Sequence, residues 1–283
     1  MFLLVEKSRQ TTIIPAVITK LSHFIRRIID LLIIIEFGNL KWIYEIKLGS
    51  MPREKIITNI GPEFHLYAQD EWNQLKKLRE SAIRILKILE NVGITAFVHG
   101  SVARGDISNT SDIDIHIPVQ IPSFKLDLIE DFQFTDRRIM MGTPNSTIRA
   151  VLVLHNDSNI SFPLCAPSER EDEFYRFSGH IYLKDLLNNR RVAGVTKKLL
   201  FIEPEEEGYW ISSVITNKKK AIQILSLSQR MIDERIRVLS RRDKIGRTGL
   251  FLDYSLSPKE NFEQALKSIA DSNVIVRRML KRR

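Results

Sequence analysis

The strongest constraint on this chain is the stretch FVHGSVARGDISNTSDIDIHI, residues 97–117, in which apolar segments enclose a glycine–serine turn. The segment before Gly100 is short and apolar, as expected for a buried strand. From residue 112 the side chains alternate, so Asp112 and Asp114 project from one face of a strand and the isoleucines from the other. The stretch therefore predicts a strand, a turn that enters a short helix, and a second strand that carries two carboxylates.

The turn and the paired carboxylates suit a phosphate group and a metal ion. Gly100 lets the backbone approach a ligand closely, and Ser101 offers a hydroxyl at a helix start, where N–H groups favour an anion. Asp112 and Asp114 repel each other and favour a cation. Their hard oxygen ligands suit Mg²⁺ or Mn²⁺, whose coordination is completed by substrate phosphates. A phosphate site beside a carboxylate pair predicts phosphoryl or nucleotidyl transfer.

Each of these features has a plain alternative when it is taken alone. A glycine–serine pair is usually a turn, and an Asp-x-Asp pair is usually a solvated strand edge. Arg104 could steady a triphosphate or be a surface charge, and the sequence favours neither. The order, the spacing and the apolar flanks together favour a catalytic site over the separate alternatives.

These residues resemble the signature of the DNA polymerase beta-like nucleotidyltransferase superfamily, in which a Gly-Gly or Gly-Ser pair precedes an Asp-apolar-Asp segment. The GSxxRG form and the serine before the first aspartate are similar to its minimal and RNA-directed branches. The resemblance implies an α+β fold with a small mixed sheet and helices on one face. It also implies that a hydroxyl attacks the α-phosphate of a nucleoside triphosphate and releases pyrophosphate. It assigns the metal to Asp112 and Asp114, and nucleotide binding to Gly100, Ser101, Arg104 and Ser111.

The superfamily usually supplies a third carboxylate from a later strand, and this chain departs from that pattern. The segments 146–154 and 160–164 predict a β-hairpin around a polar turn, and neither contains an acid. Ser161 stands where the acid is expected. Asp157, in the turn, is the nearest candidate for the third catalytic carboxylate, and Asp127 is the other.

The rest of the chain predicts two further parts. Residues 71–92 repeat apolar side chains near a period of 3.6 and predict a helix that Gly93 ends. Three more helices are predicted at residues 181–187, 217–242 and 258–283. We expect a nucleotidyltransferase domain at residues 51–178 and a basic, mainly helical domain at residues 179–283.

The charge of the chain is divided unevenly between these two parts. Up to Ser178 there are 21 Lys and Arg against 22 Asp and Glu, whereas from Gly179 there are 22 against 12. A basic half favours a polyanionic partner, and a solvated helical surface is the alternative. Aromatic residues are scattered there, which favours recognition of RNA by shape or backbone over base stacking. We therefore expect residues 179–283 to bind an RNA acceptor.

The first fifty residues are apolar, but they do not predict a membrane span. The strongest apolar run, residues 31–35, lies between Asp30 and Glu36, and a spanning helix needs about 20 mostly apolar residues. The extension has three interpretations: an amphipathic helix docked on the body, an interfacial anchor, or a spurious or loosely attached segment. We favour the last and expect Met51 to be the natural start. The single cysteine, Cys165, excludes a disulfide framework and favours a cytoplasmic protein.

Three hypotheses of function follow from these features. The leading one is an enzyme, a Mg²⁺-dependent nucleotidyltransferase that transfers a nucleoside monophosphate from a triphosphate to a hydroxyl of RNA. The second is transfer to a protein or a small molecule, as in antitoxin-like or drug-modifying branches. The third is a catalytically silent protein that binds nucleotide or nucleic acid and lacks the third carboxylate.

Overall fold

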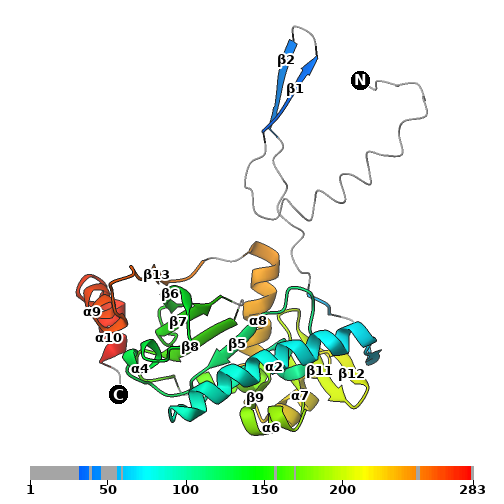
Figure 1. Ribbon diagram of the computed structural model, residues 1–283. Helices are drawn as coiled ribbons and strands as arrows, with labels where there is room; N and C mark the ends of the chain where they lie inside the picture. Colours follow the sequence, from blue (N-terminus) through cyan, green and yellow to red (C-terminus); the bar gives the residue numbers. More distant parts are fainter. Residues whose placement is uncertain are drawn as a thin grey trace. The chain divides into compact units, whose positions relative to one another are not determined.

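Figure 1 shows the computed structural model of the chain, which describes residues 32–37, 40–45, 56–58, 60–155, 158–168, 170–246 and 249–281. The chain forms two compact units, Met1–Arg53 and Glu54–Arg283. In the first unit, β1 (Leu32–Phe37) and β2 (Leu40–Glu45) pair as antiparallel strands. The interpretation of the extension as an amphipathic helix therefore does not hold for these two segments.

The second unit contains a sheet of seven strands. They are β4 (Phe97–His99), β5 (Ile113–His116), β6 (Phe134–Met141), β7 (Arg149–Leu154), β8 (Ser158–Pro163), β9 (His180–Tyr182) and β13 (Leu252–Ser255). Their order in the sheet is β13-β6-β7-β8-β5-β4-β9. β5 and β8 run parallel, and the other neighbours run antiparallel. The expected α+β fold with a mixed sheet is confirmed.

The two faces of β5 differ as the alternation of the sequence predicts. Ile113 and Ile115 are buried in the main hydrophobic core, whereas Asp114 projects from the opposite face. The predicted hairpin is also confirmed, because β7 and β8 pair antiparallel with Leu152 opposite Ile160. The strand that carries Asp114 is therefore held by an apolar layer on its other face, and Asp112 lies just before its first residue.

Helix α2 (Gln69–Asn91) confirms the helix predicted at residues 71–92, and Figure 1 shows it in cyan across the sheet. Its buried residues Ala82, Leu86 and Leu89 belong to the same core as the isoleucines of β5. The shorter helices of this region are α3 (Ser101–Arg104), α4 (Phe124–Asp127), α5 (Glu171–Ser178) and α6 (Leu183–Leu187). The predicted helix at residues 181–187 is thus β9 followed by α6.

The long helix predicted at residues 217–242 is broken into α7 (Lys218–Leu225) and α8 (Gln229–Ile245). The break follows from Ser226, which has a left-handed φ of 50°, and from Ser228, whose Oγ accepts a hydrogen bond from the N–H of the third residue of α8. Periodicity alone does not detect this break, because apolar side chains recur on both sides of it.

The last predicted helix, at residues 258–283, is likewise broken into α9 (Phe262–Ser272) and α10 (Val274–Leu280). The side chain of Asn273 accepts hydrogen bonds from two N–H groups in the first turn of α10. Asparagine is among the residues that favour this capping position, so the chain starts a new helix there. Proline 258 therefore precedes α9 without belonging to it.

Residues 179–283 contain strands as well as the expected helices. β9 and β13 lie at the two edges of the seven-stranded sheet. A second sheet has the order β10-β11-β12-β3 and consists of β3 (Glu63–Leu66), β10 (Gly194–Val195), β11 (Leu200–Glu205) and β12 (Gly208–Ser213). Glu54–Arg283 thus packs as one unit, and the domain boundary at residue 178 stays a prediction.

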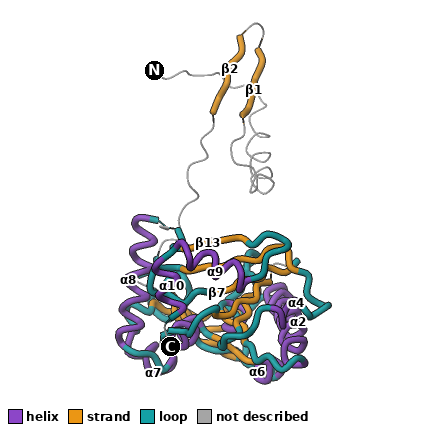
Figure 2. Tube along the Cα trace, turned by 90° about the vertical axis from the view of Figure 1, so that its left-hand side faces the viewer, coloured by secondary structure: helices purple, strands orange, loops and turns teal. Residues whose placement is uncertain are grey.

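The helices of this unit lie on different sides of it. Figure 2 shows α8 on the side opposite to α2 and α4. Among the described residues, no helix combines the length and the apolar character that crossing a membrane requires.

Candidate active site

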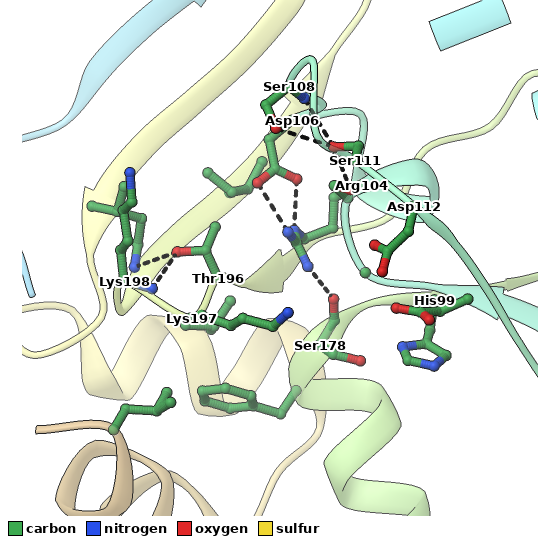
Figure 3. A pocket seen from close by; sticks show the side chains of 18 of the residues that line it. His99, Arg104, Asp106, Ser108, Ser111, Asp112, Ser178, Thr196, Lys197 and Lys198 are labelled. Atoms are coloured by element: carbon green, nitrogen blue, oxygen red, sulfur yellow. Dashed lines mark hydrogen bonds and ion pairs between the residues drawn. The ribbon is translucent and has the colours of Figure 1, made fainter. Parts of the chain in front are cut away.

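A cavity of about 450 Å³ lies beside the carboxylate face of β5 (Figure 3). Three parts of the chain line it: the loop from β4 to β5, the turn between β10 and β11 with the strands that follow it, and the helices α5 and α8. Clefts that bind small ligands typically have volumes in this range. The predicted residues Gly100, Ser101, Asp112 and Asp114 all line this cavity.

Gly100 and Ser101 form the turn between β4 and α3. Gly100 has a φ of +82°, which side-chain-bearing residues rarely adopt, and its amide donates to the Gly179 carbonyl at 3.0 Å. A Cβ at Gly100 would meet no atom within 4 Å, so the space beside it is open. The Ser101 hydroxyl donates to Ser111 Oγ at 3.1 Å, which in turn accepts from the Ser108 amide at 2.9 Å. Ser111 therefore holds the hydroxyl of Ser101 in place.

Asp114 lies close enough to Asp112 for its charge to perturb it. Burial raises the pKa of Asp112, and the charge of Asp114 raises it further. Burial also raises the pKa of Asp114, and a hydrogen bond from Asn159 offsets part of this effect. Two partly buried carboxylates that repel each other are relieved by a cation, so their chemistry fits Mg²⁺ or Mn²⁺.

The strand beside the carboxylates carries neutral residues where a third acid is expected. The parallel register of β5 and β8 places Asn159 opposite Asp114 and Ser161 opposite His116. Asn159 Nδ2 donates to Asp114 Oδ1 at 3.3 Å, and Ser161 Oγ lies 2.9 Å from His116 Nδ1. Sequence reasoning missed Asn159, because its partner is set by a pairing of strands far apart in the chain.

The sequence offers two candidates for a third acid, Asp157 and Asp127, and neither is found at the site in the described part of the chain. Asp157 lies outside the described residues. Asp127 lies at a separate hollow, with its Oδ1 3.7 Å from Arg137 Nη1. Among the described residues, no group of three or more His, Cys, Asp or Glu side chains could hold a metal ion. The described site therefore offers a carboxylate pair rather than a triad.

Arg104 lines the cavity, but its guanidinium is bonded within the protein. Its Nε and Nη2 donate to the two carboxylate oxygens of Asp106 at 2.8 and 2.9 Å, and Nη1 donates to the Ser178 carbonyl at 2.5 Å. A Cβ at Gly194 would come within 2.8 Å of the Arg104 side chain, so this glycine leaves room for the arginine stem. These bonds join the loop after α3 to the end of α5, and they favour a structural role.

Lys197 is a cavity residue that the sequence motif does not include. It lies in the turn between β10 and β11, where Thr196 Oγ1 accepts hydrogen bonds from the amides of Lys198 and Leu200 at 3.1 and 3.2 Å. Its positive charge lowers the pKa of both Asp112 and Asp114. Figure 3 shows its side chain extending from the Thr196 side of the cavity toward the side that carries Asp112. No local pattern distinguishes this lysine from a surface lysine.

Histidines and an aromatic ring support the carboxylate strand from the α5 side. The ring of His116 stacks on Tyr175 with centroids 4.3 Å apart, and His99 lies 5.0 Å from the same ring. Burial lowers the pKa of His99 to about 3 and that of His116 to about 2, and the charge of Arg149 adds to both effects. Both imidazoles are therefore neutral near pH 7, and they add no positive charge beside the carboxylates.

Comparison with known families gives one match for the chain. The chain matches the nucleotidyltransferase domain family over residues 75–223, which is more than half of its length and includes Gly100, Ser101, Asp112, Asp114 and Lys197. No curated protein and no solved structure matches the chain. The family match confirms the resemblance to the polymerase beta-like superfamily. The chain belongs to the nucleotidyltransferase domain family.

Proposed function

We propose that this chain transfers a nucleoside monophosphate from a nucleoside triphosphate to a hydroxyl of RNA, in a reaction that requires Mg²⁺ or Mn²⁺. The observation that carries the proposal is the cavity itself, in which the Gly100–Ser101 turn, two mutually repelling carboxylates and Lys197 meet. In such a reaction the acceptor hydroxyl loses its proton to solvent water and its oxygen bonds to the α-phosphorus. The bond from that phosphorus to the bridging oxygen breaks, and pyrophosphate leaves.

The residues of the cavity have separate roles in this proposal. Asp112 and Asp114 hold the divalent ion, which when bound supplies positive charge for the phosphate oxygens. The open backbone at Gly100 and the hydroxyl of Ser101 bind the triphosphate, and Ser111 orients that hydroxyl. Lys197 donates a charged hydrogen bond to the same phosphates. Asn159 fixes the orientation of the Asp114 carboxylate.

RNA is proposed as the acceptor because cations are exposed on α8, one wall of the cavity. Three cations of residues 179–283 have partners within the protein: Lys218 and Lys220 form ion pairs with Asp233 and Glu203, and Arg277 donates to backbone carbonyls of α9. Other cations are exposed along the second half of α8, among them Arg237, Arg241 and Arg242. Exposed cations on a helix that lines the cavity suit a polyanionic strand.

A second candidate function, a silent nucleotide-binding protein, is favoured by one observation. Asn159 and Ser161 occupy the strand beside Asp114, and neither can take a proton from an attacking hydroxyl as a carboxylate does. A protein of this kind would bind a triphosphate at Gly100 and Ser101 without transferring it. Retained nucleotide binding without transfer is the result that supports this candidate.

The test is incubation of the full chain with each labelled triphosphate, Mg²⁺ and total RNA. We expect label in RNA with the native chain and no label with Asp112→Asn. Label in protein, or in neither RNA nor protein, would contradict an RNA acceptor. A nucleotide-binding measurement on the same samples then separates the silent protein from one that does not bind triphosphate at all.

The triphosphate affinity of variants at Ser101 and Gly100 tests the nucleotide site separately. Ser101→Ala removes one hydrogen bond to a charged group, so triphosphate affinity should fall by roughly 1.5–3 kcal/mol. Gly100→Val should weaken binding more, because it fills the open space and places a β-branched residue at a positive φ. An unchanged affinity for both variants would remove this turn from the nucleotide site.

A further inference from the structure

Arg235 lies in α8 and lines the same cavity as Asp112 and Asp114, but neither metal binding nor triphosphate binding at Ser101 and Lys197 involves it. Its guanidinium lies over the ring of Phe174, 5.0 Å from the centroid, and over that of Phe177, 5.6 Å from the centroid. Both rings belong to α5. Helix α8, drawn in orange in Figure 1, contacts α5, and Arg235 lines the cavity from this helix.

The guanidinium of Arg235 has no acceptor within the described part of the chain. Its Nε is buried without a hydrogen-bond partner, and no hydrogen bond or ion pair joins the side chain to another described residue. Burial and the charge of Arg242 lower its pKa to about 10, so it stays protonated near pH 7. A partly buried cation with aromatic faces, a buried Nε and no acceptor is incompletely solvated, and this cost is reduced when an anion binds.

The ligand that completes such a site carries negative charge and oxygen acceptors, and a phosphate has both. Two phosphate sources would enter this cavity: the triphosphate and the acceptor strand. The triphosphate is assigned to Ser101 and Lys197, which come from other parts of the chain. Arg242 lies seven residues after Arg235, about 10 Å further along the helix axis. A strand with one phosphate per nucleotide matches this row, whereas a mononucleotide carries its phosphates in one group.

We propose that Arg235 is a phosphate-binding residue for the end of the acceptor strand and holds one of its last phosphodiesters inside the cavity. This inference rests on the proposed RNA acceptor and adds the subsite that positions its terminal hydroxyl. The aromatic rings of α5 hold the guanidinium plane, so its N–H edge remains available to the phosphate. Arg242, seven residues on, lies on the same face of α8 and then contacts a preceding phosphate outside the cavity.

The test is equilibrium binding of the full chain to a short RNA hairpin with a single-stranded 3′ end, in its natural form and with one terminal linkage replaced by a neutral methylphosphonate. Arg235→Met removes the charge and keeps the length of the apolar stem. We expect it to weaken binding of the natural RNA at least about tenfold. One of the neutral linkages should cost the native chain a similar factor and cost Arg235→Met nothing further.

The matched control is Arg237→Met, which removes one exposed cation two residues away on the same helix. It should weaken binding less and leave the chain as sensitive to the terminal linkages as the native protein. A non-hydrolysable triphosphate should bind Arg235→Met within about twofold of the native affinity, which is below half of one charged hydrogen bond. A loss of triphosphate affinity instead would assign Arg235 to the nucleotide and overturn the proposal.

Two further outcomes are decisive and do not depend on catalysis. If Arg235→Met binds natural RNA as the native chain does, the guanidinium is only a packing residue and the proposal fails. If Arg235→Met unfolds at a clearly lower urea concentration than the native chain, the contacts of Arg235 with the aromatic rings stabilise the fold. This result also contradicts the proposal that the guanidinium awaits a ligand. An absence of nucleotidyl transfer with these binding results intact would refute the proposed reaction alone.

Discussion

The two walls of the cavity are built in different ways. The first wall is continuous in sequence: Gly100, Ser101, Asp112 and Asp114 lie within one loop and the strands beside it. The second wall joins the β10–β11 turn to α5 and α8, so its residues come from separate segments. A ligand site on the first wall can be recognised from local spacing, whereas a site on the second exists only after the chain has folded.

Two arginines that line the cavity illustrate the same difference. Arg104, on the first wall, satisfies its guanidinium with Asp106 and a backbone carbonyl. Arg235, on the second wall, has aromatic faces and no acceptor among the described residues. A guanidinium whose N–H groups are hydrogen-bonded within the protein stabilises the fold, whereas a guanidinium without acceptors is explained by a ligand that supplies them. Loss of each should therefore affect different properties of the protein.

The largest expected effect is on the first wall, at Asp114. Asp114→Asn removes one charge of the carboxylate pair and keeps the shape of the side chain. A bound metal ion stabilises the negative charge of the transition state by several kcal/mol. Because the variant loses a ligand of this ion, the transfer rate should fall about 10³-fold. The measurement is the initial rate of label transfer at saturating triphosphate and RNA.

Asp131→Asn is the matched control for this prediction, because Asp131 is exposed and away from the cavity. It should transfer label at the native rate. Circular dichroism should show the native fold for both variants. If Asp114→Asn kept most of the native rate, the carboxylate pair would not hold the catalytic ion.

The next effect is on stability, and it compares the two arginines directly. Arg104→Met leaves the Asp106 carboxylate buried without its cation, and breaking a buried pair in this way costs about 3–5 kcal/mol. Arg235→Met removes a partly buried charge that has no acceptor among the described residues, so the free energy of unfolding should be unchanged or higher. Urea denaturation of the two variants measures the difference.

A second substitution separates the ion pair from the packing of the arginine stem. Asp106→Leu in the Arg104→Met background removes the orphaned carboxylate, so part of the lost stability should return. Equal stability losses in Arg104→Met and Arg235→Met would show that the distinction between the two arginines is wrong.

The sequence predicted the parts of the fold that are set by local patterns. The alternation in residues 112–118, the period of residues 71–92 and the polar turn of the hairpin correspond to β5, α2 and the β7–β8 pair. Each of these is a consequence of burying one face of a strand or helix. The motif residues Gly100, Ser101, Asp112 and Asp114 were predicted for the same reason, because they occupy fixed places on local elements.

The rest depends on pairings and breaks that local patterns do not contain. The second sheet joins β3 to β12, strands that are more than a hundred residues apart. Asn159 reaches Asp114 only through the parallel pairing of β5 with β8. Ser226 and Asn273 end helices whose apolar period continues beyond them. Lys197 and Arg235 became candidates only once the cavity was known.

Lys197 should have a smaller effect than Asp114, because it contributes one charged hydrogen bond. Lys197→Met should raise the KM for the triphosphate about tenfold to a hundredfold, with a smaller change in kcat. Lys184→Met, an exposed lysine on α6, is the control and should leave the KM unchanged. Native KM values in Lys197→Met would limit nucleotide binding to the first wall.

The smallest effect concerns the carboxylate pair in the absence of metal. Burial and mutual repulsion raise the pKa of Asp112 above that of the unfolded chain. The folded state therefore binds protons more tightly, and the free energy of unfolding falls as pH rises from the unfolded value toward and through the folded one. At pH 7 without metal the pair destabilises the fold, so Asp112→Asn should be more stable than the native chain.

This gain has a defined dependence on pH and on metal. It should shrink as pH falls through the folded-state pKa of Asp112, because protonation relieves the native chain as the substitution does. Added Mg²⁺ with a triphosphate should stabilise the native chain by mass action and leave Asp112→Asn nearly unchanged, which reverses the order. Urea denaturation at several pH values, with and without Mg²⁺, measures both effects. A native chain that is more stable than Asp112→Asn at pH 7 without metal would contradict this prediction. Other contacts of the Asp112 carboxylate would then outweigh the repulsion between the two aspartates. The carboxylates of the first wall, like the guanidinium of Arg104, would then need no ligand to compensate their charge.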